Sequence, residues 1–422
     1  MFRKRISILA ACATLGTAAA LALGPAASSA PGDNAVVHWS EVAEAAISAT
    51  PPGATGLRPP ATSAVLAGIV HGAMYDAVAA IDDTLEPFAT GVSAPPGASA
   101  DAAVATAARD VLVVRVPAQA GAVQTAYGTF MAGIPSGAAK DAGVAVGAAA
   151  AAGMLAFRLN DGIDATVPYV QPTPGPGVFE PIAPSKPVTV ELASVRPFTY
   201  SSPAYRPVPP YALTSKQYAN DVAELKALGG VNSTERTTAQ TDTARFHGSP
   251  TYLQFSGGLR RLANAQGLSL RESARLLGYT WVAVGDTMIA CWEAKYHYMF
   301  WRPNHAIQRA DTDGNPATSP DTTWLPLIVG NHPEYPSGHA CFTGGVAESL
   351  QRYFGTKHVE LILTTPAGVS RTYSRLDTLV EEVNDARVWG GLHYRTTMEE
   401  TAKHFPRIAH DVGQKYFLKP KK

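Results

Sequence analysis

The chain has 422 residues, in which 34 Lys and Arg residues balance 34 Asp and Glu residues. This near-neutral balance argues against a protein that binds nucleic acid or docks on anionic membranes. Charged residues make up only 16% of the chain and alanine is abundant, a composition suited to helices that pack closely through small side chains. The length is enough for two or three average domains or for one large helical unit.

The first thirty residues have the layout of a secretory signal peptide. A basic cluster, Arg3-Lys4-Arg5, precedes an apolar run over residues 6–23, and small residues follow at 25–30. The apolar run is also long enough for a membrane anchor, but residues 31–34 carry no basic stop-transfer cluster. We therefore expect a signal peptide over residues 1–30 and a secreted, extracellular protein.

Apolar residues recur at helical spacing along most of the remaining chain. Alternation typical of β-strands is not evident, and no stretch after the signal peptide predicts a membrane span without interruption by charge, Gly or Pro. The expected fold class is therefore all-α. Helices are predicted over residues 38–48, 61–81, 102–115, 118–131, 136–159, 215–228, 233–247 and 269–302.

A proline-rich stretch without periodicity, residues 163–212, separates two helical parts. Its aromatic residues indicate an ordered, irregular excursion across the surface. The predicted organisation is an N-terminal helical bundle over residues 31–162, this excursion, and a C-terminal bundle over residues 213–422 that carries the candidate site. Cys291 and Cys341 are the only cysteines after the signal peptide; they are expected to pack as small apolar residues, and a disulfide between them stays open.

The first of three candidate site segments is residues 292–303, with the sequence WEAKYHYMFWRP. Lys295 and Arg302 are seven residues apart, so on one helix they would share a face, and Pro303 would end that helix. A solvated basic face is the alternative. However, the residues between the two cations are almost all aromatic or apolar, which favours burial, and two buried cations need an anion.

The second segment is residues 335–343, with the sequence YPSGHACFT. Pro336 and Ser337 favour a helix start, where free backbone N–H groups and the helix dipole bind tetrahedral anions, and Gly338 lets an oxyanion approach the backbone. Ser337 adds a hydroxyl donor, and His339 adds a side chain that exchanges protons near neutral pH. Alone, this pattern is more typical of an ordinary helix cap.

The third segment is residues 385–395, with the sequence DARVWGGLHYR. Arg387 and His393 would face different sides of a straight helix, but Gly390 and Gly391 supply a bend that can bring both to one point. A single histidine is usually a core residue. The three segments together instead predict a pocket for a trianionic oxyanion, with an acid/base and an axial nucleophile or ligand.

In this order, the three segments resemble a known signature. Lys295-x6-Arg302-Pro303, Pro336-Ser337-Gly338-His339 and Arg387-x5-His393 match the signature of the vanadium haloperoxidase and type-2 phosphatidic acid phosphatase (PAP2) superfamily. The chain is most similar to the exported bacterial haloperoxidase-like branch. The resemblance implies helical bundles of the PAP2 type, two packed four-helix bundles in the larger members, and vanadate as the cofactor.

The resemblance also implies a role for each residue. His393 would bind vanadium axially, His339 would act as acid/base, and Lys295 would polarise hydrogen peroxide before a halide attacks it to give hypohalous acid. In the phosphatase reaction, His393 would instead attack phosphorus and His339 would protonate the leaving alcohol. The equatorial oxygens would be bound by Lys295, Arg302, Ser337, Gly338 and Arg387.

Length, export and Trp292 favour a haloperoxidase over a secreted acid phosphatase, because a Trp three residues before the lysine resembles the halide site of chloroperoxidases. His332 lies seven residues before His339, where chloroperoxidases have Phe and bromoperoxidases have His. Unless His332 is only a loop residue, it favours bromide over chloride. The expected partners are hydrogen peroxide, a halide and an organic acceptor, or a phosphate ester for a phosphatase; an oligomer is compatible with the sequence.

The chain departs from the family after His393, where an aromatic residue and an Asp are expected beyond the next arginine. Glu399 and Glu400 are candidates for the replaced carboxylate, and Asp242 and Asp286 are candidates for orienting Arg387. A third hypothesis is an exported binding protein without turnover. The two histidines of the signature disfavour it, because binding alone needs no acid/base.

Overall fold

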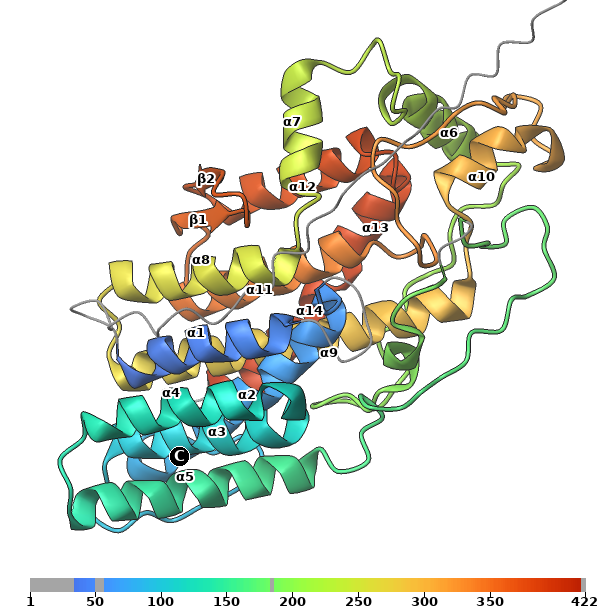
Figure 1. The fold of residues 1–422 in the computed structure, drawn as a ribbon. Helices are drawn as coiled ribbons and strands as arrows, with labels where there is room; N and C mark the ends of the chain where they lie inside the picture. The colour runs from blue at the N-terminus through green and yellow to red at the C-terminus, as the bar shows by residue number, and fades with distance from the viewer. Residues whose placement is uncertain (1–33, 50–56, 183–185, 419–422) are drawn as a thin grey trace, which may run out of the picture.

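The computed structural model describes residues 34–49, 57–182 and 186–418. The predicted signal peptide lies outside these described residues. Within them, helices dominate the fold (Figure 1). The α-helices are α1 (Ala35–Ser48), α2 (Pro60–Ile81), α3 (Ala100–Arg115), α4 (Ala120–Ala132), α5 (Ala138–Phe157), α6 (Lys216–Leu228), α7 (Thr238–Phe246), α8 (Thr251–Ala265), α9 (Leu270–Tyr298), α10 (Pro303–Gln308), α11 (Gly338–Phe354), α12 (Leu376–Trp389), α13 (Arg395–His404) and α14 (Pro406–Val412).

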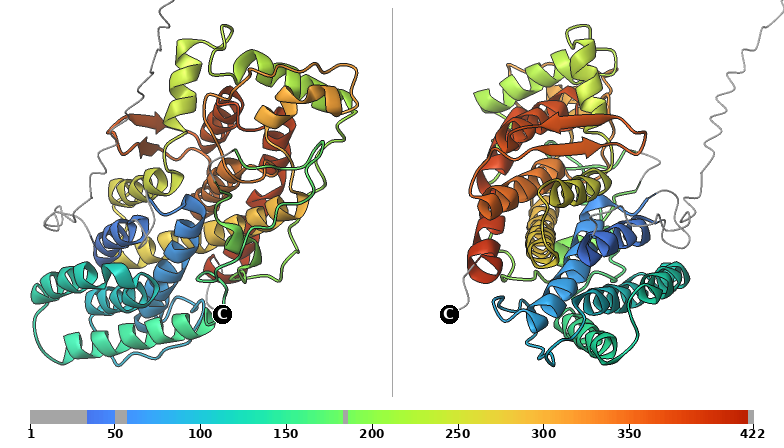
Figure 2. Two further views of the ribbon diagram at one scale, coloured as in Figure 1. Left: turned by 45° about the vertical axis from the view of Figure 1, so that its right-hand side comes forward. Right: turned by 90° about the vertical axis from the view of Figure 1, so that its left-hand side faces the viewer.

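Two groups of helices pack around α9. Helices α1 to α5 lie at one end of the molecule, where α2 runs along α9; α11 to α13 lie toward the other end, and α14 leads the chain back along α9 to the N-terminal helices (Figures 1 and 2). One continuous buried core extends through both groups, and a second, smaller core lies among α6, α10 and α13. The prediction of an all-α protein built from helical bundles is therefore confirmed.

The ends of α9 show how local sequence sets the helix bounds. Ser269 and Glu272 form a capping box at its start, as predicted. At its end, Met299 adopts the left-handed conformation with φ +47°, so the helix stops earlier than predicted. Arg302 therefore does not share a helix face with Lys295. Instead it is the N-cap of α10, and Pro303 begins that helix rather than ending α9.

The excursion is irregular in its described parts, residues 163–182 and 186–212, apart from the short 3-10 helix η2 (Val190–Ser194). It is tied to the end of α9 by two backbone hydrogen bonds: Phe179 N donates to Met299 O over 2.7 Å and Trp301 N to Gly177 O over 3.0 Å. The excursion thus helps to fix the chain just before Arg302.

The prediction that the chain has no strand is wrong at one place. Strands β1 (Leu361–Thr364) and β2 (Ser370–Tyr373) form an antiparallel hairpin, and β1 packs on α8. Each strand has only four residues, which is too short for a period of two to stand out from the flanking sequence.

Helices α3 and α5 approach each other unusually closely. A Cβ added at Gly143 would lie 2.3 Å from the carbonyl oxygen of Ser99, and one at Gly147 would lie 2.2 Å from that of Ala103. These distances are well inside van der Waals contact, so the two helix backbones pack directly against each other, without intervening side chains. The abundance of small residues noted in the sequence has this packing role.

Two helices of the described residues are long and apolar enough to cross a membrane by length and composition alone. In α2, 89% of the apolar window is buried inside the protein, whereas in α5 the buried share is 33%. The burial of α2 is that of a core helix. The absence of a membrane span after the signal peptide stays a prediction.

Substituting Gly147 with alanine is expected to lower the free energy of unfolding by about 1–3 kcal/mol, because the added methyl group must push α5 away from α3. Gly128, on α4, is the matched control: no atom lies within 4 Å of a Cβ built there, so Gly128→Ala should raise the free energy of unfolding by roughly 0.5–1 kcal/mol. Urea unfolding of both variants measures the difference. Equal effects of the two substitutions would contradict the close packing.

Candidate functional site

The three predicted segments meet where α9 ends, α11 begins and α12 ends. Arg302 Nη1 lies 3.4 Å from His393 Nε2, and a Cβ at Gly338 would lie 3.8 Å from Lys295 Cε. Arg387 also acts electrostatically on His339 and His393. The structure thus gathers all the predicted cofactor-binding residues at one buried place, where the exposed fractions of the side-chain donors are Lys295 0%, Ser337 0%, His393 1%, Arg302 3% and Arg387 4%.

The ammonium group of Lys295 holds the loop that precedes α11. It donates to the carbonyl oxygens of Pro333 over 2.9 Å and Glu334 over 3.0 Å, and also to that of Pro336. An ammonium group has three N–H donors, and all three have partners here. Burial lowers the pKa of Lys295 to about 8. In this conformation Lys295 orders the loop, and its direct contact with an anion stays a prediction.

Arg302 is fixed by the same loop and by the segment after α12. Its Nε donates to the carbonyl oxygen of His332 over 2.7 Å, its Nη2 to His332 Nδ1 over 2.8 Å, and its Nη1 to the carbonyl oxygen of Leu392 over 2.7 Å. The imidazole of His332 lies against Trp292, with ring centroids 5.2 Å apart. The two residues predicted to line a halide pocket, Trp292 and His332, are therefore neighbours at the edge of the cation cluster.

Arg387 is oriented by a backbone carbonyl and not by the carboxylates that the sequence suggested. Its Nη1 donates to the carbonyl oxygen of His247 over 2.9 Å. Asp286 instead accepts hydrogen bonds from Phe198 N and Thr199, and Asp242 is exposed. The predictions for these two aspartates are wrong. Burial and, to a smaller extent, the charge of Arg302 together lower the pKa of Arg387 to about 9.

Glu334 is the carboxylate that sequence reasoning missed. Its Oε1 accepts from His393 Nδ1 over 2.8 Å and from Tyr394 N over 3.2 Å, and its Oε2 accepts from the hydroxyl of Thr397 over 2.9 Å. A proton on Nδ1 leaves the lone pair of neutral His393 on Nε2, facing the cations. Burial raises the pKa of Glu334 to about 7, against the opposing charges of Arg302 and Lys295.

The other proposed carboxylates do not take this role. Glu400 pairs with His404 over 3.2 Å, and Glu399 is exposed. The signal for Glu334 was present in the sequence, because it is the acidic residue three positions before Ser337. Its partner His393 is 59 residues away along the chain, and only the fold shows that they meet.

Ser337 caps the start of α11, as predicted. Its hydroxyl accepts from Ala340 N over 3.4 Å, and its own N–H donates to the hydroxyl of Thr401 over 3.1 Å. His339 follows in the first turn. Burial and the charge of Arg387 hold the pKa of His339 well below its ordinary value, so this imidazole is neutral at pH 7.

The site has donors that an oxyanion would satisfy. Arg387 Nε and Trp292 Nε1 are buried donors with no hydrogen-bond partner within the described residues; the buried ring nitrogen His339 Nε2, which donates or accepts according to the tautomer, has no partner there either. Orphaned buried polar groups are rare in folded proteins and point to a missing partner. The cluster holds three cations, and within the described residues the carboxylate of Glu334 offsets the charges of Arg302 and Lys295, so positive charge is in excess. The residues present therefore fit a vanadate or phosphate group.

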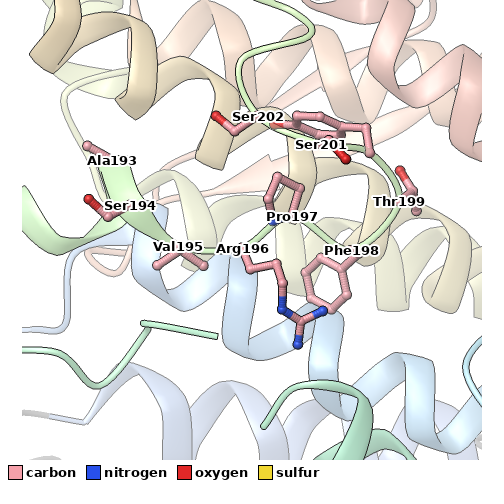
Figure 3. A pocket seen from close by; sticks show the side chains of 10 residues that line it. Ala193, Ser194, Val195, Arg196, Pro197, Phe198, Thr199, Ser201 and Ser202 are labelled. Carbon is pink, nitrogen blue, oxygen red and sulfur yellow. The ribbon is translucent and has the colours of Figure 1, made fainter. Parts of the chain in front are cut away.

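Two cavities among the described residues lie outside the cation cluster. The larger, about 560 Å³, is lined by residues 193–202 of the excursion (Figure 3). There Arg196 already donates to the carbonyl oxygens of Phe157 and Leu159, which is a structural role. The smaller, about 130 Å³, is walled in part by Tyr335, Tyr394 and Thr397, and so lies beside the Glu334–His393 pair.

Comparisons with known proteins agree with this geometry. A family model described as the VCPO second helical-bundle domain matches residues 275–418. The vanadium chloroperoxidase of Curvularia inaequalis is 28% identical over 257 residues, and the match covers 46% of this chain and 41% of that protein. The match thus spans less than half of that relative. This similarity does not by itself show the activity of this chain.

Solved structures share the fold over nearly the whole chain. The first bacterial vanadium-dependent iodoperoxidase superposes with a TM-score of 0.73 at 18% identity, covering 92% of this chain and 97% of its own. A bacterial vanadium-dependent chloroperoxidase in its holo form gives 0.71 at 19% identity, covering 90% and 97%. At these identities the solved structures show that the chain has the fold of the bacterial vanadium haloperoxidases, and the family model and the fungal relative show that part of the chain is similar to vanadium haloperoxidases in sequence.

Two substitutions of Glu334 distinguish the effect of its charge from the effect of its hydrogen bonds. Glu334→Ala leaves His393 Nδ1 without its acceptor, and we expect orthovanadate to bind about 10–100-fold more weakly, the usual effect of losing a partner behind a metal-binding histidine. Glu334→Gln keeps a carbonyl oxygen for that bond and should bind within a few-fold of the parent. Titration calorimetry with orthovanadate gives both affinities. Parental affinity in the alanine variant would contradict the positioning role.

Proposed function

We propose that this chain is a secreted, vanadate-dependent haloperoxidase that oxidises halide with hydrogen peroxide to hypohalous acid. The single observation that carries the proposal is the set of buried polar nitrogens without a partner, Arg387 Nε and His339 Nε2, in the same cation cluster as the lone pair of His393 Nε2. A donor set of this kind is suited to an oxyanion with a histidine ligand, and the relatives named above are vanadium haloperoxidases.

The chain's own residues divide the work between binding and proton transfer. Vanadate, when bound, supplies the centre at which peroxide is activated toward halide. Arg302, Arg387 and Lys295 neutralise the oxyanion charge, and they are already fixed before it binds, so little reorganisation is needed. His393 would be the vanadium ligand through Nε2, because Glu334 holds its proton on Nδ1.

His339 is the proton carrier of the proposed site. Its Nε2 has no partner among the described residues, and its pKa is held well below the ordinary value by burial and nearby cations. A neutral imidazole can take a proton from an incoming peroxide, and a bound anion would restore part of its basicity by offsetting the charge of Arg387.

Halide would bind beside Trp292 and His332. Trp292 offers an N–H without a partner within the described residues and its ring lies beside the His332 imidazole. Because Arg302 Nη2 donates to His332 Nδ1, one strong donor is withheld from the pocket. A weaker donor set favours the less strongly hydrated bromide over chloride, and we propose bromide as the preferred halide, with an organic acceptor for the product.

A secreted acid phosphatase is the alternative. The same cation cluster would stabilise a five-coordinate phosphoryl group, and His393 Nε2, with its lone pair set by Glu334, would be the nucleophile that forms a phosphohistidine. The two functions differ in what vanadate does: it is a cofactor for the haloperoxidase and an inhibitor for the phosphatase.

Peroxide-dependent bromination of a phenol dye is expected to appear when orthovanadate is added to the metal-free protein. His393→Ala should reduce this rate by more than about 100-fold, because losing a direct ligand exceeds the 10–100-fold effect of losing a residue behind it. Assays of a phosphate ester run in parallel. Ester hydrolysis that vanadate inhibits, without bromination, would replace the haloperoxidase proposal with the phosphatase.

His332→Phe is expected to raise the ratio of kcat/KM for chloride to that for bromide by roughly 5–10-fold. The substitution frees one N–H of Arg302, and one additional hydrogen bond is worth about 1 kcal/mol. Steady-state rates with each halide give the ratio, and the bromide rate of the same variant serves as the internal control for loss of fold. A ratio within about 2-fold of the parent would contradict a role for His332 in halide preference.

A further inference from the structure

Cys291 and Cys341 are both free and buried, and both flank the cation cluster. Cys291 lies on α9 one turn before Lys295, and Cys341 lies in the first turns of α11, two residues after His339. Both cysteines are close enough to Lys295 to raise its pKa, against the larger lowering by burial. Neither cysteine has a part in the proposed reaction.

Close helix packing on either side of this pair places the two cysteines opposite each other. On α11, Gly338, Cys341 and Gly345 share one face, because they are three and four residues apart. A Cβ at Gly338 would lie 3.0 Å from the Trp292 ring of α9, and a Cβ at Gly345 would lie 3.3 Å from the Thr287 hydroxyl of the same helix. The two backbones therefore approach closely both before and after Cys341.

The position of Cys291 on α9 completes this geometry. It lies between Thr287 and Trp292 in sequence, on the side of α9 that faces α11. Burial raises the pKa of the Cys341 thiol, and the neighbouring Cys291 thiol raises it as well, in agreement with a position of the two thiols next to each other. Two cysteines that face each other between closely packed antiparallel helices are placed for a disulfide.

We propose that Cys291 and Cys341 are an oxidisable pair, and that hydrogen peroxide converts them into a disulfide linking α9 to α11. One thiol attacks peroxide, the O–O bond breaks, and a sulfenic acid forms with release of one water. The second sulfur then attacks the sulfenic sulfur, the S–O bond breaks, and the S–S bond forms with release of a second water. Two thiols and one peroxide thus give one disulfide and two waters.

The cross-link would act on the site itself. It joins the turn that precedes Lys295 to the turn that follows His339, so it fixes the distance between the two helices that carry them. It also closes a long loop that includes α10 and the 332–336 segment, which restricts the unfolded chain. The inference depends on helix packing and not on haloperoxidase activity. If the chain is a haloperoxidase, hydrogen peroxide is also its substrate and would regularly be present near the pair.

The test uses the full chain, reduced and free of vanadate and halide, and treated with hydrogen peroxide or, in parallel, with diamide. We expect an intact mass about 2 Da lower, a linked pair of Cys291 and Cys341 peptides in a non-reducing digest, and an unfolding temperature that rises and returns after reduction. Because burial raises the pKa of the Cys341 thiol, the reaction should take minutes to hours.

Single substitutions provide the controls. Cys291→Ala and Cys341→Ala should each abolish the linked peptide, whereas Cys12→Ala, in the predicted signal peptide, should leave it unchanged. The proposal is overturned if peroxide leaves both thiols free, or if it adds about 16 or 32 Da to single cysteines without a cross-link. These results are independent of any bromination assay, so failure of the pair and failure of the proposed function are distinguishable.

Discussion

Three buried cations held in place by backbone carbonyl oxygens are the feature on which the site depends. Lys295 donates to carbonyls of the loop before α11, Arg302 to those of His332 and Leu392, and Arg387 to that of His247. A carbonyl orients a cation without cancelling its charge. The cluster is therefore rigid and still strongly positive, whereas the same cations paired with carboxylates would be satisfied and would have little affinity for an anion.

This arrangement explains why irregular backbone surrounds a site in a helical protein. Carbonyl oxygens inside a helix are already hydrogen-bonded, so free ones occur at helix ends and in loops. The carbonyl of His247 lies at the C-cap of α7, and that of Leu392 follows the turn at Gly391, whose φ of +72° places it in the left-handed region. A Cβ at Gly391 would also lie 2.4 Å from the Gly229 carbonyl oxygen, so the turn needs glycine on both counts.

The sequence predicted the helices and the members of the cation cluster well, but it did not predict which groups hydrogen-bond to those members. Caps such as Ser269 and Ser337 are local signals, and they were placed correctly. The early end of α9 was missed because Met299 adopts a conformation that its residue type does not indicate. Glu334 and the carbonyl partners were missed for a deeper reason: a backbone acceptor has no residue-type signature, and contacts across 59 residues exist only in the fold.

Helix α9 links the stability of the fold to the geometry of the site. Its first half packs on α2 at close range, and its second half packs on α11 and ends three residues after Lys295. A Cβ at Gly278 would lie 3.0 Å from Tyr75 of α2, so the backbone position of α9 is set by the N-terminal helices. Because α9 is one continuous, close-packed helix, the position of its first half also sets the position of its second half, which carries Lys295. The N-terminal helices thus contribute no residue to the cation cluster, yet they determine where Lys295 stands relative to the start of α11.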